Sequence, residues 1–222
     1  KYFMSMICVL LISGVWAQSE CSEYYPFTEG SITELTNYDK KGKVASRTEY
    51  LVKEASGGSV TIMTKVSDKD GEEIASSEFD MKCEGDGILI DIQSMYSPQL
   101  MAQYESMETS ITGEDLALPN GLKKGDKLED AEMFISINMG GINMNAEVAM
   151  MDREVVGEES VTVEAGTFDC IIIEYTSLLK MGLERKGTAK QWISKGVGVV
   201  KQEDYNKRGK VMSSTELTRF EK

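Results

Sequence analysis

The stretch VTVEAGTFDCIIIEY, residues 161–175, contains the most apolar strand candidate in the chain. Its start predicts a short strand, its middle (EAGT) a tight turn, and residues 168–175 a long β-branched strand. Ile171, Ile172 and Ile173 follow one another without a polar interruption, which is typical of a strand covered on both faces. We therefore expect this strand at the centre of a sheet, with the other strands beside it.

Alternating runs on both sides of this stretch are separated by turns that contain glycine. Examples are DKKG at 39–42, DKDG at 68–71 and EGDG at 84–87, where glycine supplies the positive φ of a tight turn. The pattern predicts an all-β, mainly antiparallel chain with about eleven to thirteen strands. We expect a curved open sheet or half-barrel formed by a single domain over residues 18–222.

Two segments interrupt the alternation. Leu100, Met101 and Tyr104 recur at helical spacing after Pro98, which predicts a short helix near 97–106. The segment LALPNGLKKGDKL, residues 116–128, contains Pro119 and several turn residues and predicts a loop.

One internal repeat aligns NYDKKGKVASRTEY, residues 37–50, with DYNKRGKVMSSTEL, residues 204–217. Two hairpins under the same turn constraints could converge on this pattern. A duplication, with the first and last hairpins at equivalent places in the sheet, explains it equally well. The sequence leaves both explanations open.

Residues 1–17 have the features of a secretory signal peptide, with a basic start, the apolar run MICVLLI and small residues at Val15 and Ala17. We expect cleavage after Ala17. No later apolar run reaches the length of about 20 residues needed for a membrane-spanning helix. The chain is therefore predicted to be exported. Glu20 departs from the pattern of a lipid-attachment site at Cys21.

Three cysteines remain after the predicted cleavage, and an oxidising compartment allows two of them to pair. Cys83 and Cys170 both lie in predicted strands, and we expect a disulfide between them. Cys21, close to the new N-terminus, is the alternative partner. Three unpaired thiols are the remaining possibility.

The composition removes several classes of function. The chain has no histidine, which excludes Ser-His-Asp and Cys-His catalysis and zinc sites that use histidine. It has 24 basic and 37 acidic side chains, a net charge of −13, which makes nucleic acid a poor partner. We expect no catalytic residues, no metal and no cofactor. The acidic pairs Glu114-Asp115, Glu129-Asp130 and Glu158-Glu159 lie in polar segments and are expected to face solvent.

Methionine is concentrated in two neighbouring predicted strands. Its flexible thioether fills irregular cores, and it also lines cavities for irregular apolar ligands. Core filling is the simpler interpretation. The candidate ligand-lining residues are Met133, Ile135, Met139, Met144 and Met150, together with Leu100 and Met101 from the predicted helix.

Three separated stretches resemble one protein family. YYPFTEGSITELTNYDKKGK at 24–43, VTVEAGTFDC at 161–170 and QWISKGVGVVKQEDYNKRGK at 191–210 are similar to the DUF3108-like (TapB-like) proteins of the Gram-negative envelope. The resemblance covers nearly all of residues 18–222. It implies an exported β-rich protein in the periplasm or outer envelope of a Gram-negative bacterium. It also implies a curved open sheet similar to that of the LolA and LolB lipoprotein carriers. It implies no catalytic residues.

These observations lead to two main hypotheses and a minor one. In the first, a non-enzymatic envelope protein binds an apolar or lipid-like ligand on the concave face of its sheet. In the second, the chain is a structural or interaction module that docks another envelope protein through sheet edges or hairpins. The third is a glycan hydrolase that uses carboxylates alone. The sequence does not determine the ligand, the strand order or the oligomeric state.

Overall fold

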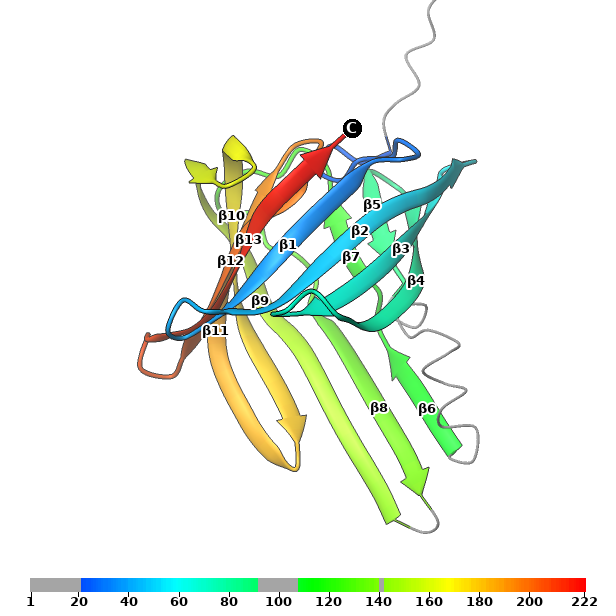
Figure 1. Ribbon diagram of the computed structural model, residues 1–222, viewed down its shortest axis with the longest axis vertical. Helices are drawn as coiled ribbons and strands as arrows, with labels where there is room; N and C mark the ends of the chain where they lie inside the picture. The colour runs from blue at the N-terminus through cyan, green and yellow to red at the C-terminus, as the bar shows by residue number, and fades with distance from the viewer. Residues whose placement is uncertain (1–20, 92–107, 140–141) are drawn as a thin grey trace, which may run out of the picture.

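The computed structural model describes residues 21–91, 108–139 and 142–222, and these residues form thirteen strands and no helix (Figure 1). The strands are β1 (Ile32–Asp39), β2 (Val44–Ser56), β3 (Ser59–Asp68), β4 (Glu73–Glu84), β5 (Gly87–Ile90), β6 (Glu108–Gly113), β7 (Leu116–Pro119), β8 (Ala131–Met139), β9 (Ile142–Val163), β10 (Gly166–Met181), β11 (Leu183–Ser194), β12 (Gly198–Asn206) and β13 (Val211–Glu221). The prediction of an all-β antiparallel chain is confirmed. The helix expected near 97–106 lies outside the described residues.

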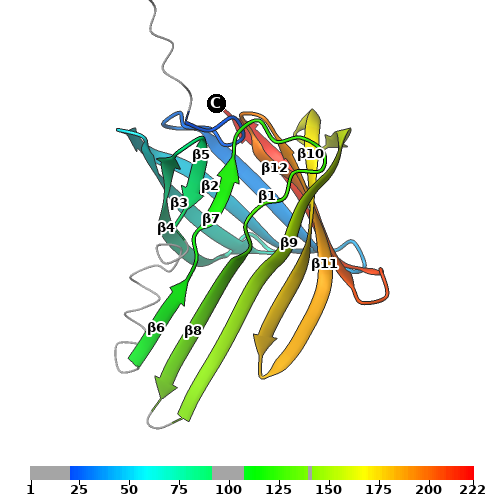
Figure 2. The same ribbon diagram turned by 180° about the vertical axis from the view of Figure 1, so that it is seen from behind.

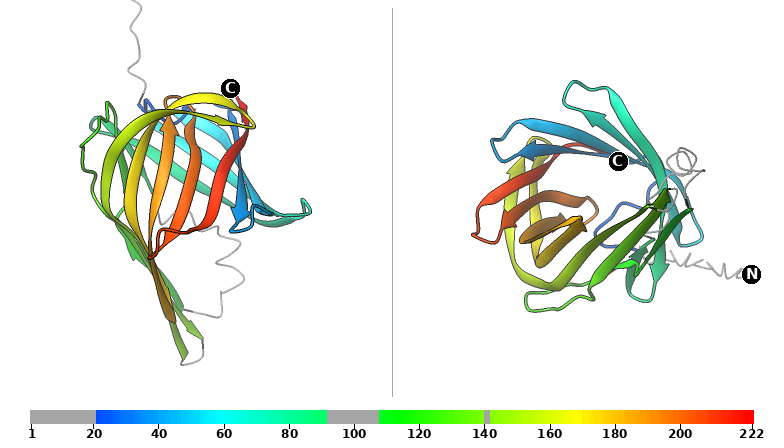
Figure 3. Two further views of the ribbon diagram at one scale, coloured as in Figure 1. Left: turned by 90° about the vertical axis from the view of Figure 1, so that its left-hand side faces the viewer. Right: turned by 90° about the horizontal axis from the view of Figure 1, so that it is seen from below.

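All thirteen strands belong to one sheet, in the order β6-β8-β9-β10-β11-β12-β13-β1-β2-β3-β4-β5-β7. Every neighbouring pair is antiparallel. The sheet curves strongly around an interior, which is visible when the molecule is seen from below (Figure 3). It remains an open sheet, since its two edge strands, β6 and β7, do not pair with each other. The expected curved open sheet is therefore confirmed.

The apolar strand at 168–175 belongs to β10, which lies between β9 and β11, but the middle of the strand order is β13. The prediction of a strand covered on both faces is right, because the adjacent residues Cys170 and Ile171 are both buried. The covering comes partly from the β9–β10 hairpin itself. Its tip bends until Ala165 N–H donates to the carbonyl of Leu217 on β13, at 3.3 Å.

The first and last strands are neighbours, because β1 pairs with β13 from Ile32 opposite Glu221 onward. The two repeated hairpins, β1–β2 and β12–β13, therefore lie side by side. Their turns are alike: Asp39 Oδ1 accepts from the backbone N–H groups two and four residues later, and Asn206 Oδ1 does the same. Asp68 forms an identical turn between β3 and β4, where the strand sequences are not repeated. The turn constraint therefore accounts for the Asp/Asn-x-x-Gly part of the repeat.

One segment, residues 108–119, connects the two edges of the sheet. Its first half, β6, pairs with β8, and its second half, β7, pairs with β5, with only Glu114 and Asp115 between them (Figure 2). The loop predicted over residues 116–128 is therefore wrong at its start. A four-residue strand ending in proline has too little alternation to be recognised, and proline is tolerated there because β7 is an edge strand.

A buried arginine holds this edge to the rest of the sheet. Arg153 of β9 is only 3% exposed, and its Nη1 donates to the carbonyls of Ala117 on β7, at 3.2 Å, and Glu129, at 2.7 Å. The residue before it, Asp152, has a φ of 55° at a register shift between β9 and β10. This irregularity lets β9 present Arg153 and Val155 to the interior beside the seam between β7 and β8.

The segment 21–29 packs across one end of the curved sheet, at the top of Figure 1. The hydroxyl of Tyr24 accepts from Leu122 N–H at 3.1 Å, and Gly196 N–H donates to the carbonyl of Glu23 at 2.7 Å. Tyr24 is 1% exposed. These bonds join three regions that are distant in the sequence and close that end of the interior.

The disulfide joins Cys21 to Cys83, so the predicted Cys83–Cys170 pairing is wrong. Cys170 is a free, buried cysteine on β10, and six strands separate β10 from β4 in the sheet order. Alternation places a cysteine on a strand but does not say how many strands lie between two of them. Burial, with Asp169 and Glu159 nearby, raises the pKa of the Cys170 thiol to about 11.

Candidate functional site

A cavity of about 470 Å³ lies inside the curve of the sheet. Residues from β1–β5, β7–β9 and β11–β13 line it, together with Tyr25, Pro26 and Ser31 from the segment that precedes β1. The alternation of side chains along each strand explains which residues line the cavity. Thr33, Leu35 and Asn37 point inward from β1, as every second residue of a strand does.

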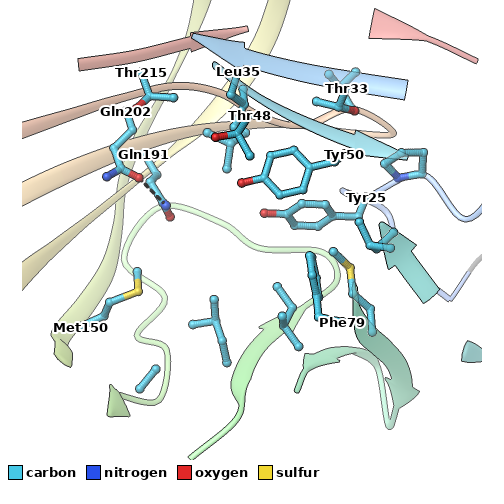
Figure 4. A pocket seen from close by; sticks show the side chains of 18 of the residues that line it. Tyr25, Thr33, Leu35, Thr48, Tyr50, Phe79, Met150, Gln191, Gln202 and Thr215 are labelled. Atoms are coloured by element: carbon cyan, nitrogen blue, oxygen red, sulfur yellow. Dashed lines mark hydrogen bonds between the residues drawn. The ribbon is translucent and has the colours of Figure 1, made fainter. Parts of the chain in front are cut away.

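One wall of the cavity carries a row of neutral polar side chains, which we call the polar row: Gln191, Gln202, Thr215 and Asn37. They come from β11, β12, β13 and β1, and each is the register partner of the next. Gln191 Nε2 donates to Gln202 Oε1 at 2.7 Å, and Thr215 Oγ1 donates to Asn37 Oδ1 at 2.7 Å. The row therefore consists of fixed amide and hydroxyl groups along a continuous ladder (Figure 4).

Two tyrosines project into the cavity beside the polar row, with their hydroxyls toward its interior (Figure 4). Among the described residues, neither Tyr25 nor Tyr50 has a hydrogen-bond partner for its hydroxyl. Burial raises the pKa of both phenols, so both are neutral in the physiological range. The ring of Tyr50 also meets Phe79 edge to face, with 6.4 Å between centroids.

The position of Tyr25 depends on a glycine at the start of β12. Gly198 has a φ of +91°, and a Cβ at this position would lie 2.8 Å from the ring of Tyr25. The Gly196-Val197-Gly198 sequence therefore serves a turn and a close contact, as expected for a glycine pair between strands.

The opposite wall is apolar. It combines Phe79 and Met81 of β4 with Met133 of β8 and Val148 and Met150 of β9. Ile62, Ile90, Leu116 and Ala131 complete this surface. The wall includes the seam where β7 approaches β8, so the sheet has no continuous ladder there.

The cavity contains little formal charge. Among the described lining residues, Glu132 is the only acidic one, and none is lysine or arginine. The nearest described cation is Arg153, whose charge acts on both Tyr25 and Tyr175. Two backbone carbonyls occupy Arg153 Nη1, while its Nε is buried without a hydrogen-bond partner.

The structure brings Met133 and Met150, both predicted as ligand-lining residues, into this cavity. Ile135 instead lines a second, more polar hollow between β6, β8 and β9. Met139 and Met144 belong to the far ends of β8 and β9, beyond that hollow. Leu100 and Met101 lie outside the described residues.

Sequence reasoning missed the polar row and both tyrosines. Gln191, Gln202 and Thr215 alternate with outward-facing residues, and alternation does not identify which face is internal. The repeat contained one usable signal, because Thr48 and Thr215 occupy equivalent repeat positions and both line the cavity.

The acidic pairs have separate roles in the structure. Glu159 accepts from Trp192 Nε1 at 2.5 Å, and Asp130 accepts from the backbone of Asp152 at 2.8 Å. Over residues 21–91, 108–139 and 142–222, no three acidic or cysteine side chains gather as a metal site would require. In the same ranges, no helix has the length and apolar character to cross a membrane.

Two solved bacterial structures share this fold. One is a protein of Bacteroides fragilis with a YmcC-like fold, described as a candidate exported protein; it is 22% identical, with a TM-score of 0.74 over 91% of this chain and 100% of that one. The other, from Parabacteroides distasonis, is described as a candidate lipoprotein; it is 23% identical, with a TM-score of 0.71 over the same shares.

A comparison with curated proteins finds no match. The model of one protein family, described as DUF3108-like, matches residues 28–217. This range begins just before β1 and ends within β13, so it contains every strand of the polar row and of the apolar wall. The chain thus belongs to the DUF3108-like family.

Proposed function

We propose that this chain is an exported, non-enzymatic envelope protein that holds an apolar or lipid-like ligand in its cavity. The observation that carries the proposal is the cavity itself, about 470 Å³ in volume with an apolar wall opposite a polar one. Small-molecule sites are typically about 300–1,000 Å³ and combine apolar lining with a few fixed polar groups.

The energetics favour a ligand with an extended apolar part. Each methylene removed from water contributes about 0.8 kcal/mol, so an acyl chain of about ten carbons gains about 8 kcal/mol. Association costs at least about 4 kcal/mol in lost freedom. The net value of at most about 4 kcal/mol corresponds to a dissociation constant of about 1 mM or weaker, before any polar contact is counted.

Several observations support an exported location in the periplasm or outer envelope. A disulfide between Cys21 and Cys83 is suited to an oxidising compartment. The signal peptide expected over residues 1–17 and the descriptions of the two structural neighbours as candidate exported protein and lipoprotein agree with export. The proposal includes no catalytic step, because the chain has no histidine, and Asp130 and Glu159 of the acidic pairs accept local hydrogen bonds.

Native mass spectrometry of protein purified from an envelope fraction tests the proposal. We expect an added mass that organic extraction removes and that is identified as a lipid or other amphiphile. Val148→Trp fills the cavity from the apolar wall and should abolish the added mass. Ser160→Trp places the same side chain at an exposed position on the same strand and should leave it unchanged. Protein that carries no ligand and binds none from an envelope lipid extract would refute the proposal.

An interaction module is the second candidate function, and the tip of the β10–β11 hairpin favours it. Met181 is 61% exposed and Leu183 is 79% exposed on a hairpin that extends beyond the curved part of the sheet (Figure 2). Exposed large apolar side chains at a projecting tip are suited to docking a protein partner.

Crosslinking in cells tests this second function. A photoreactive residue in place of Leu183 should capture one protein stoichiometrically, and M181E should prevent capture. Glu184→Lys changes an exposed charge near the same tip and should not prevent capture. The absence of any captured protein counts against docking through this hairpin.

A further inference from the structure

We infer that the cavity selects an uncharged amphiphile whose hydroxyl, amide or ester groups meet the polar row and the two cavity tyrosines. This inference rests on the proposed function and specifies the chemical class of the ligand. The inferred selectivity concerns the head group of the ligand, because the apolar wall opposite contacts the tail.

The polar wall presents donors and acceptors that are neutral. Gln191 Nε2 donates to Gln202 Oε1, and Gln202 Nε2 donates to Asp204 Oδ1 at 3.2 Å. Both glutamine side chains still have unused capacity, because each amide has two donor hydrogens and two acceptor lone pairs. Thr48 and Thr215 add hydroxyls on the same side of the cavity. Such a surface recognises hydroxyl, carbonyl and amide groups equally well.

Five hydroxyls that line the cavity, those of Tyr25, Ser31, Thr33, Thr48 and Tyr50, have no partner among the described residues. Those of Tyr25 and Tyr50 point inward, and Ser31, which is 1% exposed, has a buried Oγ without a hydrogen bond. Buried polar groups in folded proteins are almost always paired, so the unpaired Ser31 Oγ beside the cavity indicates that a group inside the cavity supplies its partner. The oxygens of a ligand head group can do so.

The electrostatics disfavour a charged head group. A carboxylate or phosphate would be transferred from water to a cavity whose described lining contains one acidic residue, Glu132, and no cation. The whole chain carries a net charge of −13, which also opposes the approach of anions. Burial keeps the phenols neutral, so they do not compensate a cation either. An unpaired charge in such a site is costly, whereas a neutral head group loses only hydrogen bonds that the wall replaces.

Arg153 is the strongest argument for the opposite conclusion, because it is buried near Tyr25. Its Nη1 is engaged by two carbonyls, and the side chain does not line the cavity. We therefore assign Arg153 to the seam and not to ligand recognition. A comparison of neutral, anionic and cationic ligands distinguishes a role of Arg153 at the seam from a role in ligand recognition.

The test compares three ligands with the same tail: monododecanoylglycerol, dodecanoate and dodecyltrimethylammonium. Affinity is measured at neutral pH as displacement of the apolar fluorescent probe N-phenylnaphthylamine from the delipidated protein. Each ligand is used below its own critical micelle concentration. We expect the neutral glyceride to bind at least about tenfold more tightly than either ion. Tighter binding of dodecanoate overturns the inference in favour of Arg153, and tighter binding of the cation overturns it in favour of Glu132.

The two proposals fail in distinguishable ways. If neither the probe nor any of the three ligands binds, the proposed function is refuted and the inference falls with it. If all three bind within about threefold of each other, the cavity is an apolar site and only the head-group selection is refuted.

A matched pair of variants tests the role of the hydroxyls. Tyr25→Phe combined with Tyr50→Phe keeps both rings and removes only the hydroxyls, so we expect glyceride affinity to fall about tenfold while probe affinity is unchanged. Tyr205→Phe, whose hydroxyl donates to Glu203 away from the cavity, should change neither. Unchanged glyceride affinity in the double variant would contradict the assignment of these hydroxyls to the ligand.

Discussion

The two walls of the cavity are built differently. The polar wall follows β11, β12, β13, β1 and β2, which form an unbroken antiparallel ladder. The apolar wall runs from β3 to β9 and contains the seam, where Arg153 and backbone contacts replace a ladder. The directional groups of the polar row therefore lie wholly on a continuous part of the sheet, whereas the apolar lining extends across the discontinuity between β7 and β8.

This difference has a physical reason. Hydrogen bonds weaken steeply with misalignment, so the groups that form them need a fixed backbone. Apolar contact depends on the area removed from water and tolerates small displacements, especially where methionine is present. The comparison teaches that this sheet can be open on one side without losing the groups that would orient a ligand.

The largest expected effect comes from the covalent link to the apolar wall. Cys21 and Cys83 are 62 residues apart in sequence, and a loop of this length corresponds to about 4 kcal/mol in the chain-entropy estimate. Replacing both cysteines by serine should lower the free energy of unfolding by this order, measured by urea denaturation of residues 18–222. Cys170→Ala, on β10, should cost clearly less, because it removes one small buried side chain and no crosslink. Equal losses would show that the link contributes little.

A somewhat smaller effect is expected at the seam. Arg153→Met retains a long side chain and removes the bonds to Ala117 and Glu129, which should cost about 3 kcal/mol, because hydrogen bonds from a charged donor are the stronger kind. Hydrogen exchange should rise most in β7. Arg185→Met, at an exposed position of β11, should change stability by less than about 0.5 kcal/mol. Uniform exchange across the sheet in the Arg153 variant would contradict a local role at the seam.

The polar row should respond weakly, and in a non-additive way. Gln191→Leu removes the donor to Gln202 and should cost about 1 kcal/mol, because it leaves an acceptor unpaired. Replacing both glutamines by leucine should recover part of this loss, since the pair then has no unpaired group and only Asp204 Oδ1 loses a donor. Urea denaturation of the two single variants and the double variant completes the cycle. Additive losses would indicate that the two side chains act independently.

The smallest effect concerns the hairpin turns, which should behave alike in both walls. Backbone N–H groups of Lys43 and Lys41 hold the pKa of Asp39 below its usual value, and those of the 68–72 turn do the same for Asp68. A lowered carboxyl pKa adds stability above the unfolded-state pKa, and this stability is lost as the pH falls through the folded-state pKa. Asp39→Asn should therefore reduce the acid sensitivity of unfolding, and Asn206→Asp should increase it.

Urea midpoints at neutral pH and near pH 3 measure this pair of variants, because the carboxyl groups titrate between these conditions. Opposite changes in the two variants support the turn as the source of the sensitivity. If the difference in urea midpoint between the two pH values is unchanged in both variants, the acid sensitivity arises elsewhere in the protein.

The strands and their turns could be predicted because both signals are local. Alternation and the Asp-x-x-Gly turns depend on a few consecutive residues, and most of the predicted hairpins are present. Strand order is not local, which explains why Cys83 was assigned the wrong partner. The same limit applies to the site: Met133 and Met150 were identified by their chemistry, whereas the polar row required knowledge of which face is internal.

The pairing of β1 with β13 also constrains when the site can form. Asn37 and Thr215 are 178 positions apart, yet they share a hydrogen bond within the polar row. Contacts of such long sequence separation slow folding, because the loop must close before the contact contributes. A growing or partly translocated chain can form its local hairpins early, but it cannot complete the polar row until its last hairpin is available. The complete cavity is in this sense a late product of folding, and C-terminal truncation before β13 should leave a chain with hairpins and no polar row.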